Sequence, residues 1–173
     1  YRLDVAVSQD LERYPEILEG PRLFLSVGHD EYWSWGMRDA LDGFVERGGN
    51  AAILSGNTCF WQVRFDDDHA GMTGYKYRAD EDPVLGTGEQ RFLTGCWSDR
   101  RIGRPETSTI GLTFTRGGYS RYGLGAAESS GAYTVHRPDH WAFDGTGLAA
   151  GRGFGGGDAI VAYECDGCAF EIG

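Results

Sequence analysis

Two apolar runs flank a segment with helical spacing in the first third of the chain. Residues 22–27 form a short apolar run, which is typical of a strand buried on both faces. After Ser34, which can cap a helix, apolar residues recur every three to four positions, at Met37, Ala40, Leu41, Phe44 and Val45. The glycines at 48–49 supply a left-handed helix stop, and residues 51–55 form a second apolar strand. The order strand, helix, strand predicts a crossover between parallel strands.

The rest of the chain carries weaker patterns. Residues 1–7 alternate apolar and polar positions as a half-buried strand does. From Phe65 onward the periodicity is poor and glycine and proline are frequent, which indicates loops and short strands. Three segments of this β-rich half are expected to be strands, the last of them rejoining the main sheet: residues 110–115, 132–135 and 159–163.

Together these patterns predict an α/β fold, a mostly parallel sheet flanked by helices with a loop-rich, β-rich second half. We expect one domain over residues 1–173, with a core at 1–64, a loop-rich insertion at 65–140 and a return to the sheet at 141–173. Because the chain starts inside a predicted strand, we also expect it to be a piece of a longer polypeptide.

Composition excludes some classes of function. The formal net charge is −10, and a negative charge disfavours binding to a phosphate backbone, so nucleic acid is not an expected partner. No window is apolar enough to cross a membrane, and the start of the chain has no signal-peptide pattern, which favours a cytoplasmic location. In that compartment the four cysteines are expected to be reduced and none catalytic: Cys59, Cys96, Cys165 and Cys168.

Polar side chains follow both predicted parallel strands where they end. His29, Asp30 and Glu31 come after the first strand, and Asn57 comes after the second. Because such strand ends meet at one edge of a parallel sheet, we expect His29, Glu31 and Asn57 to face a common cleft. A carboxylate there can bind a hard metal or act as a base, and an imidazole can move a proton. Alternatively, the carboxylates only stabilise the first turn of the helix.

Other motifs are weaker. The acidic run at 66–69 lacks the spacing of a calcium loop and is interpreted as solvated. Cys165 and Cys168 lack a second pair at zinc spacing, so a tight turn is favoured. His140 either lines a pocket or precedes aromatic residues, Trp141 and Phe143, that cover the core.

Four ordered motifs resemble the C-terminal region of the large (beta) chain of N,N-dimethylformamidase. They are Gly-His-Asp-Glu-Tyr-Trp-Ser at 28–34, Ser-Gly-Asn-Thr-Cys-Phe-Trp-Gln-Val-Arg at 55–64, Arg-Pro-Asp-His-Trp at 137–141 and Tyr-Glu-Cys-Asp-Gly-Cys at 163–168. The resemblance spans nearly the whole chain. It implies a class I glutamine amidotransferase-like, flavodoxin-like sheet and a mononuclear iron held by two tyrosinates and one glutamate.

The resemblance also implies roles for particular residues. Glu31 matches the iron-binding glutamate, and His29 and Asn57 match polar residues of the same pocket, where they are expected to be catalytic. Within the matching motifs, the side chains expected to bind substrate are Trp61, Arg64 and His140. The family's tyrosine ligands lie upstream of the glutamate, at positions that Tyr1 and Tyr14 do not match. Either those ligands belong to residues outside this chain, or this relative works without iron.

The leading hypothesis is therefore an iron-dependent amide hydrolase that converts an amide into a carboxylate and an amine. Its expected partners are a small amide substrate, the rest of its own polypeptide, and further copies or a small partner subunit. The alternatives are a non-catalytic, amidotransferase-like domain that binds a small ligand such as a sugar, and a domain that serves assembly alone.

Overall fold

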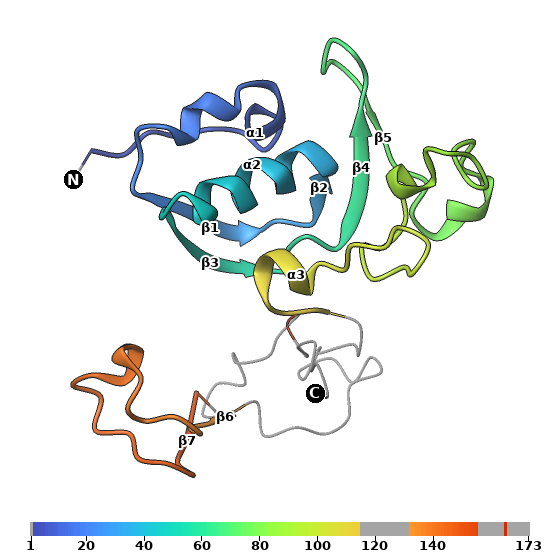
Figure 1. Cartoon of the computed structure of the whole chain (residues 1–173). Helices are drawn as coiled ribbons and strands as arrows, with labels where there is room; N and C mark the ends of the chain where they lie inside the picture. Colours follow the sequence, from blue (N-terminus) through green and yellow to red (C-terminus); the bar gives the residue numbers. More distant parts are fainter. Residues whose placement is uncertain (1, 115–131, 156–164, 166–173) are drawn as a thin grey trace. The chain divides into compact units, whose positions relative to one another are not determined.

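The computed structural model describes residues 2–114, 132–155 and 165. These residues belong to two compact units, which divide between Thr113 and Phe114 (Figure 1). The first unit contains the crossover segment and the strand ends with the polar side chains.

The predicted crossover is confirmed. Strand β1 (Leu23–His29) is followed by helix α2 (Trp35–Glu46) and strand β3 (Asn50–Gly56), and β1 and β3 pair in parallel (Figure 1). The Ser34 hydroxyl accepts the backbone N–H of Met37 at 3.1 Å and so caps α2. Gly48, with φ of 92°, ends the helix in the left-handed region, as expected for a residue without a Cβ atom.

The prediction that the first strand is buried on both faces is wrong. Only Ser26 of β1 is buried, and Leu23, Leu25 and Val27 are 52%, 45% and 70% exposed. These side chains are exposed because β1 and β3 form a sheet of two strands in the described part of the chain. Phe24, on the other face, packs edge-on against Trp33 and contacts the core.

The strand predicted over residues 1–7 is also wrong. Residues 2–7 are irregular, and Leu3 and Val5 are 77% and 88% exposed. An alternating pattern forms a strand only beside a partner, and no described strand pairs with this segment. Two short helices follow it, α1 (Asp10–Arg13) and η1 (Pro15–Leu18).

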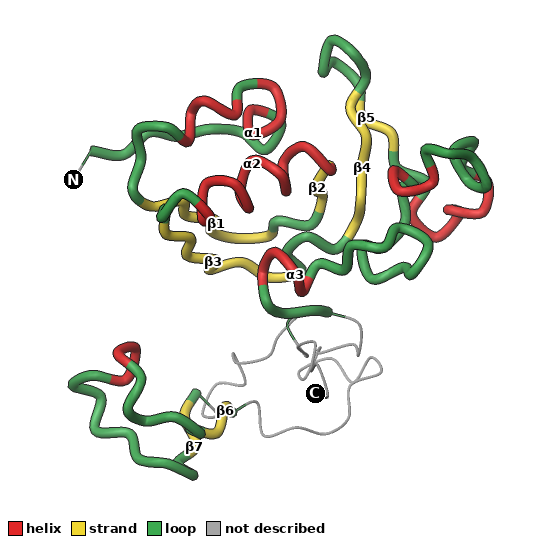
Figure 2. Tube along the Cα trace, viewed as in Figure 1, coloured by secondary structure: helices red, strands yellow, loops and turns green. Residues whose placement is uncertain are grey.

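A second sheet stands next to the polar strand end. It has the order β2 (Tyr32–Ser34), β4 (Trp61–Phe65), β5 (Met72–Thr73), with β2 parallel and β5 antiparallel to β4 (Figure 2). The three-residue strand β2 is too short to leave a periodic signal in the sequence. It places Tyr32 opposite Trp61, and this pairing builds one side of the site.

Beyond β5 the first unit is loop-rich, as predicted. It contains the short helices η2 (Lys76–Glu81), η3 (Gln90–Phe92) and α3 (Thr107–Ile110). The strand expected at 110–115 is therefore wrong in its described part, because Ile110 ends α3 and Gly111 closes that helix with φ of 76°. Arg38 of α2 is fully buried and donates to the carbonyl oxygens of Arg104 and Pro105 just before α3.

The core of the first unit lies between α2 and these loops. Its buried apolar side chains form one cluster: Leu11, Leu18, Trp33, Met37, Leu41, Phe44, Cys59, Ala79, Leu93, Trp97 and Ile102. Three of the five apolar positions predicted for the helix face belong to it. Val45, also predicted for that face, is 46% exposed.

The second unit is described over a shorter stretch. A two-residue strand β6 (Tyr133–Thr134) confirms the strand expected at 132–135 and pairs with β7 (Gly153–Phe154). Helix η4 (Trp141–Phe143) lies between them, and Trp141 is 78% exposed, so it is not a core residue. The strand predicted at 159–163 lies outside the described residues.

The chain is thus a mixed α/β protein whose small sheets are partly parallel. The more detailed amidotransferase-like arrangement stays a prediction. The longest described helix, α2, has 12 residues, so none in the described part of the chain could span a bilayer.

Candidate functional site

The two polar strand ends lie side by side, as the sequence predicts. His29, the last residue of β1, is the register partner of Gly56, the last residue of β3. The backbone N–H of Asp30 donates to the Gly56 carbonyl at 3.3 Å, and the N–H of Cys59 donates to the Asp30 carbonyl at 2.9 Å. These bonds fix the turn that carries His29, Asp30 and Glu31.

Asp30 has a structural role in this turn. One of its carboxylate oxygens accepts the Ser26 hydroxyl at 2.5 Å, and the other accepts the Trp33 ring N–H at 3.0 Å. The Ser26 hydroxyl also contacts the Ser55 hydroxyl at 2.6 Å, which connects the turn to β3. The Asp30 carboxylate is therefore committed to neighbours on the protein side.

Glu31 is held at the edge of the cavity. The Trp61 ring N–H donates to Oε1 of Glu31 at 2.7 Å, and Nε2 of His29 lies 3.3 Å from Oε2. The backbone carbonyl of Glu31 accepts the N–H groups of Phe60 and Trp61 at 3.0 and 2.9 Å. The side chain of Glu31 is 19% exposed and that of His29 is 51% exposed. A carboxylate beside an imidazole, partly open to solvent, can orient the ring for proton transfer.

Lys76 and Tyr32 complete this corner, and neither is predicted as a site residue from the sequence. The Lys76 ammonium donates to the Tyr32 hydroxyl at 2.8 Å and lies 5.1 Å from the centre of the Trp61 ring. The hydrogen bond to Tyr32 and the charge of Glu31 raise the pKa of Lys76 above its ordinary value. The backbone of Lys76 has φ of 56°, in the left-handed region that residues other than glycine seldom adopt. Such backbone conformations are concentrated at functional sites.

Hydrogen bonds to Thr94, and from Thr94 to Asp82, hold the loop that carries Lys76 in place. The N–H of Lys76 donates to the Thr94 carbonyl at 2.8 Å, and the Thr94 hydroxyl donates to Asp82 at 2.7 Å. Arg64 then pairs with Asp82 through two hydrogen bonds of 2.8 and 2.9 Å. The only sequence signal for Lys76 was that it is the one lysine of the chain, which carries no structural information.

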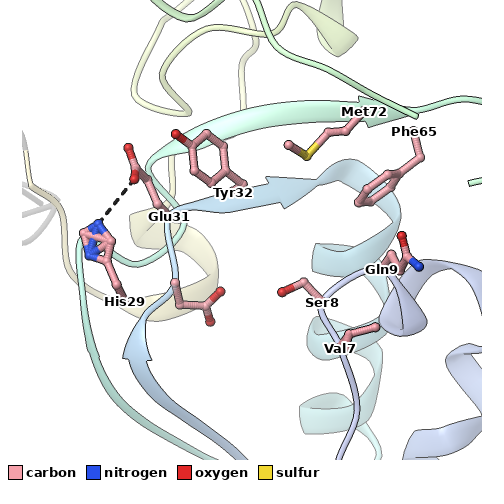
Figure 3. Close-up of a pocket in the computed structure, with 9 residues that line it drawn as sticks. Val7, Ser8, Gln9, His29, Glu31, Tyr32, Phe65 and Met72 are labelled. Carbon is pink, nitrogen blue, oxygen red and sulfur yellow. Dashed lines mark hydrogen bonds and ion pairs between the residues drawn. The ribbon is translucent and has the colours of Figure 1, made fainter. Parts of the chain in front are cut away.

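A cavity of about 480 Å³ opens beside these groups (Figure 3). His29 and Glu31 lie on one side of it, Phe65 and Met72 lie on the other, and Tyr32 stands between them. The lining residues are Val7, Ser8, Gln9, His29, Asp30, Glu31, Tyr32, Phe65 and Met72.

Asn57 lies one residue beyond the register partner of His29, but it does not line this cavity. Asn57 is 6% exposed, and its backbone has φ of 50°. Its side-chain Oδ1 has no hydrogen-bond partner among the described residues. An unsatisfied buried oxygen is costly, which is compatible with a group that receives a partner in another state.

The residues expected to bind substrate lie in three different settings. Trp61 is 2% exposed and contacts Glu31. Arg64 is engaged by Asp82 and by the carbonyl oxygen of Phe92 at 2.6 Å, a set of contacts that favours a structural role. His140 belongs to the second unit, where its Nδ1 accepts the N–H of Ala142 and caps η4.

Cys59 is buried and Cys96 is half-buried. Burial raises the pKa of Cys59 well above its ordinary value and raises the pKa of Cys96 to about 11, so neither thiol is activated. Both are free, which agrees with the reduced state predicted for them. Cys168 lies outside the described residues, so the Cys165–Cys168 prediction is not tested.

The Glu31 carboxylate could serve as a metal ligand. Its Oε1 contacts the Trp61 ring N–H and its Oε2 contacts the His29 ring, and each oxygen has a further lone pair. Among the described residues, no group of three or more His, Cys, Asp or Glu side chains could hold an ion. The described residues thus fit one ligand of an iron site and do not complete it.

Comparison with known proteins supports the resemblance noted from the motifs. No curated protein matches the chain. Residues 1–172 match the family described as N,N-dimethylformamidase beta subunit-like, C-terminal, and this match includes the strand ends, Trp61 and Lys76. The chain therefore belongs to the N,N-dimethylformamidase beta subunit-like, C-terminal family.

Proposed function

We propose that this chain forms part of the catalytic domain of an amide hydrolase of the dimethylformamidase type. Such an enzyme converts an amide and water into a carboxylic acid and an amine. The observation that carries the proposal is the Glu31 carboxylate, which is held by Trp61, contacts His29 and borders a cavity. The family match over residues 1–172 supports the same reaction class.

His29 is the group that moves the proton. Nε2 of His29 lies beside Oε2 of Glu31, and the imidazole acts as the base that takes a proton from the attacking water. The Glu31 carboxylate stabilises the imidazolium that results. The imidazolium then gives a proton to the nitrogen of the leaving amine as the carbon–nitrogen bond breaks. The exposure of the His29 ring, 51%, lets water reach it.

Tyr32 is the donor for the amide carbonyl oxygen. Its oxygen accepts a hydrogen bond from Lys76, so its own O–H can donate to the negative charge that develops on that oxygen. Hydrogen bonds in series strengthen one another, and the Lys76 ammonium adds a positive charge close by. This pair therefore stabilises the tetrahedral intermediate.

Iron is proposed as the cofactor, with Glu31 as one ligand and the others outside the described residues. When bound, iron supplies Lewis acidity toward the amide carbonyl. Asn57 remains a predicted catalytic residue, and its unsatisfied Oδ1 supports a role in binding a donor that arrives with the substrate or with a further segment.

The proposal is tested by assaying hydrolysis of simple formamides by the full protein and by a His29→Gln variant. Loss of the proton-transfer group should lower kcat by roughly 10² to 10⁴ while iron content is unchanged. A His136→Gln variant, changed at an exposed histidine of the second unit, should keep full activity. An iron-loaded wild-type protein that hydrolyses no amide, or a fully active His29→Gln variant, would contradict the proposal and favour a ligand-binding domain.

A further inference from the structure

The cavity has an apolar side that the proposed chemistry does not use. Val7, Phe65 and Met72, here called the apolar wall, lie across the cavity from the carboxylate of Glu31 (Figure 3). Val7 and Met72 are 59% and 54% exposed although their side chains are apolar. Apolar side chains exposed beside convergent polar groups are typical of a binding pocket.

The part of the apolar wall formed by β4 and β5 is fixed in place. Phe65 and Met72 are register partners, so their side chains project from the same face of the hairpin. The hairpin is closed by the N–H of Asp66, which donates to the Gly71 carbonyl at 3.1 Å. The ring of His69 stacks against Phe65 with 5.7 Å between centroids.

Val7, the remaining residue of the apolar wall, is hydrogen-bonded to helix α1. The N–H of Val7 donates to the Asp10 carboxylate at 2.9 Å, and the N–H of Asp10 donates to the Val7 carbonyl at 2.9 Å. Glu12 of α1 reaches across to His69, with 3.8 Å between Oε1 and Nε2. The two parts of the apolar wall are therefore connected through α1 and the hairpin.

The size of the cavity points to a ligand larger than a simple formamide. A water-sized group takes up ~30 Å³, so 480 Å³ has room for more than about ten such groups. A formamide with two methyl groups would leave the apolar wall in contact with water. An amide with a branched alkyl or aromatic group could place its carbonyl oxygen at the Tyr32 hydroxyl and cover Met72 with that group.

We infer that the pocket selects amides that carry a bulky apolar substituent, which packs against Val7, Phe65 and Met72 while the carbonyl oxygen accepts a hydrogen bond from the Tyr32 hydroxyl. This inference rests on the proposed function for the reaction and adds the substrate class. Met72 is suited to this role because its flexible thioether adapts to ligands of different shape.

The test is calorimetric binding of N-benzylformamide and N,N-dimethylformamide to the full protein in its His29→Gln form, which is expected to slow turnover by roughly 10² to 10⁴ and to keep the iron. Met72→Gln and Val7→Thr are combined with it, because both keep side-chain size and replace apolar surface by polar groups. Val45→Thr is the matched control, since Val45 is similarly exposed on α2 and lies outside the cavity.

The benzyl compound should bind at least roughly tenfold more tightly than the dimethyl compound, and each change in the apolar wall should reduce that preference by roughly five- to tenfold. The Val45→Thr variant should keep it. Equal binding of the two amides, or a preference that survives Met72→Gln, would overturn the inference. The wild type could hydrolyse neither amide while the benzyl compound still binds more tightly than the dimethyl compound. That result would support the pocket assignment and contradict the proposed hydrolysis.

Discussion

Trp61 donates its ring N–H to Oε1 of Glu31 across 2.7 Å, and the two residues are 30 positions apart in the sequence. The same tryptophan is 2% exposed, so it cannot rotate away without disturbing the core. This contact sets the direction of the carboxylate that faces His29. Trp61 is therefore a positioning residue for Glu31.

Trp61→Phe keeps an aromatic ring and removes the N–H donor. Hydrogen bonds to charged groups contribute about 1.5 to 3 kcal/mol, so we expect kcat/KM for amide hydrolysis to fall by roughly 10- to 100-fold. Trp97→Phe is the matched control, because Trp97 is also fully buried and its ring N–H has no partner among the described residues. Equal losses of activity in the two variants would show that Trp61 serves packing alone.

Lys76 and Tyr32 should act as a unit. Lys76→Met and Tyr32→Phe are each expected to lower kcat by roughly 10²-fold, because either change removes part of the donor that faces the carbonyl oxygen. The double variant should lose little more than either single variant, since both changes break one interaction. Steady-state kinetics of all four proteins make the comparison. Losses that simply multiply would mean that the two groups act independently.

The Arg64–Asp82 pair should govern acid stability. Burial alone would raise the pKa of Asp82, but hydrogen bonds from Arg64 and Thr94 outweigh burial and lower it to about 2. The unfolded chain therefore takes up this proton first as the pH falls. The stabilisation is present in full above pH ~4 and is lost as the pH falls toward 2.

Asp82→Asn removes this effect and leaves Arg64 without its anion, at a cost of about 2 to 4 kcal/mol near neutral pH. Urea denaturation at pH 7 and pH 3 measures it. The difference in unfolding free energy between wild type and variant should shrink at the lower pH. A difference that is the same at both pH values would show that the charge of Asp82 is not what stabilises the loop.

The buried thiol of Cys59 should be unreactive in the folded protein. Cys59 is fully buried and its pKa is raised by burial, so iodoacetamide at pH 8 should label it only after unfolding. Mass spectrometry of native and denatured samples distinguishes the two cases. Rapid labelling of native Cys59 would reopen a nucleophilic role for that residue.

The sequence was informative where structure is local. The Ser34 cap, the spacing of Met37, Leu41 and Phe44, and the glycine stop predicted α2, because these signals act within a few residues. The parallel pairing of β1 and β3 followed from the helix between them. The strand ends with His29 and Glu31 could therefore be placed together from the sequence alone.

Non-local contacts could not be predicted in this way. Lys76 meets Tyr32 across 44 positions, and this contact depends on the loop that Thr94 and Asp82 hold in place. The alternating pattern of residues 1–7 predicts a strand, but alternation does not supply a partner strand, and none pairs with the described residues 2–7. Residues 110–115 include β-branched side chains that favour a strand, whereas Ile110 ends a helix that Gly111 closes.

The most direct test of the account is the Glu31→Gln variant of the full protein, measured for iron content and for amide hydrolysis beside Asp30→Asn. Both substitutions remove one negative charge from the same turn, but the Asp30 carboxylate is bound by Ser26 and Trp33. We expect Glu31→Gln to lose the iron and the hydrolytic activity together and Asp30→Asn to retain both. A Glu31→Gln variant that keeps iron and full activity would contradict the central role assigned to Glu31.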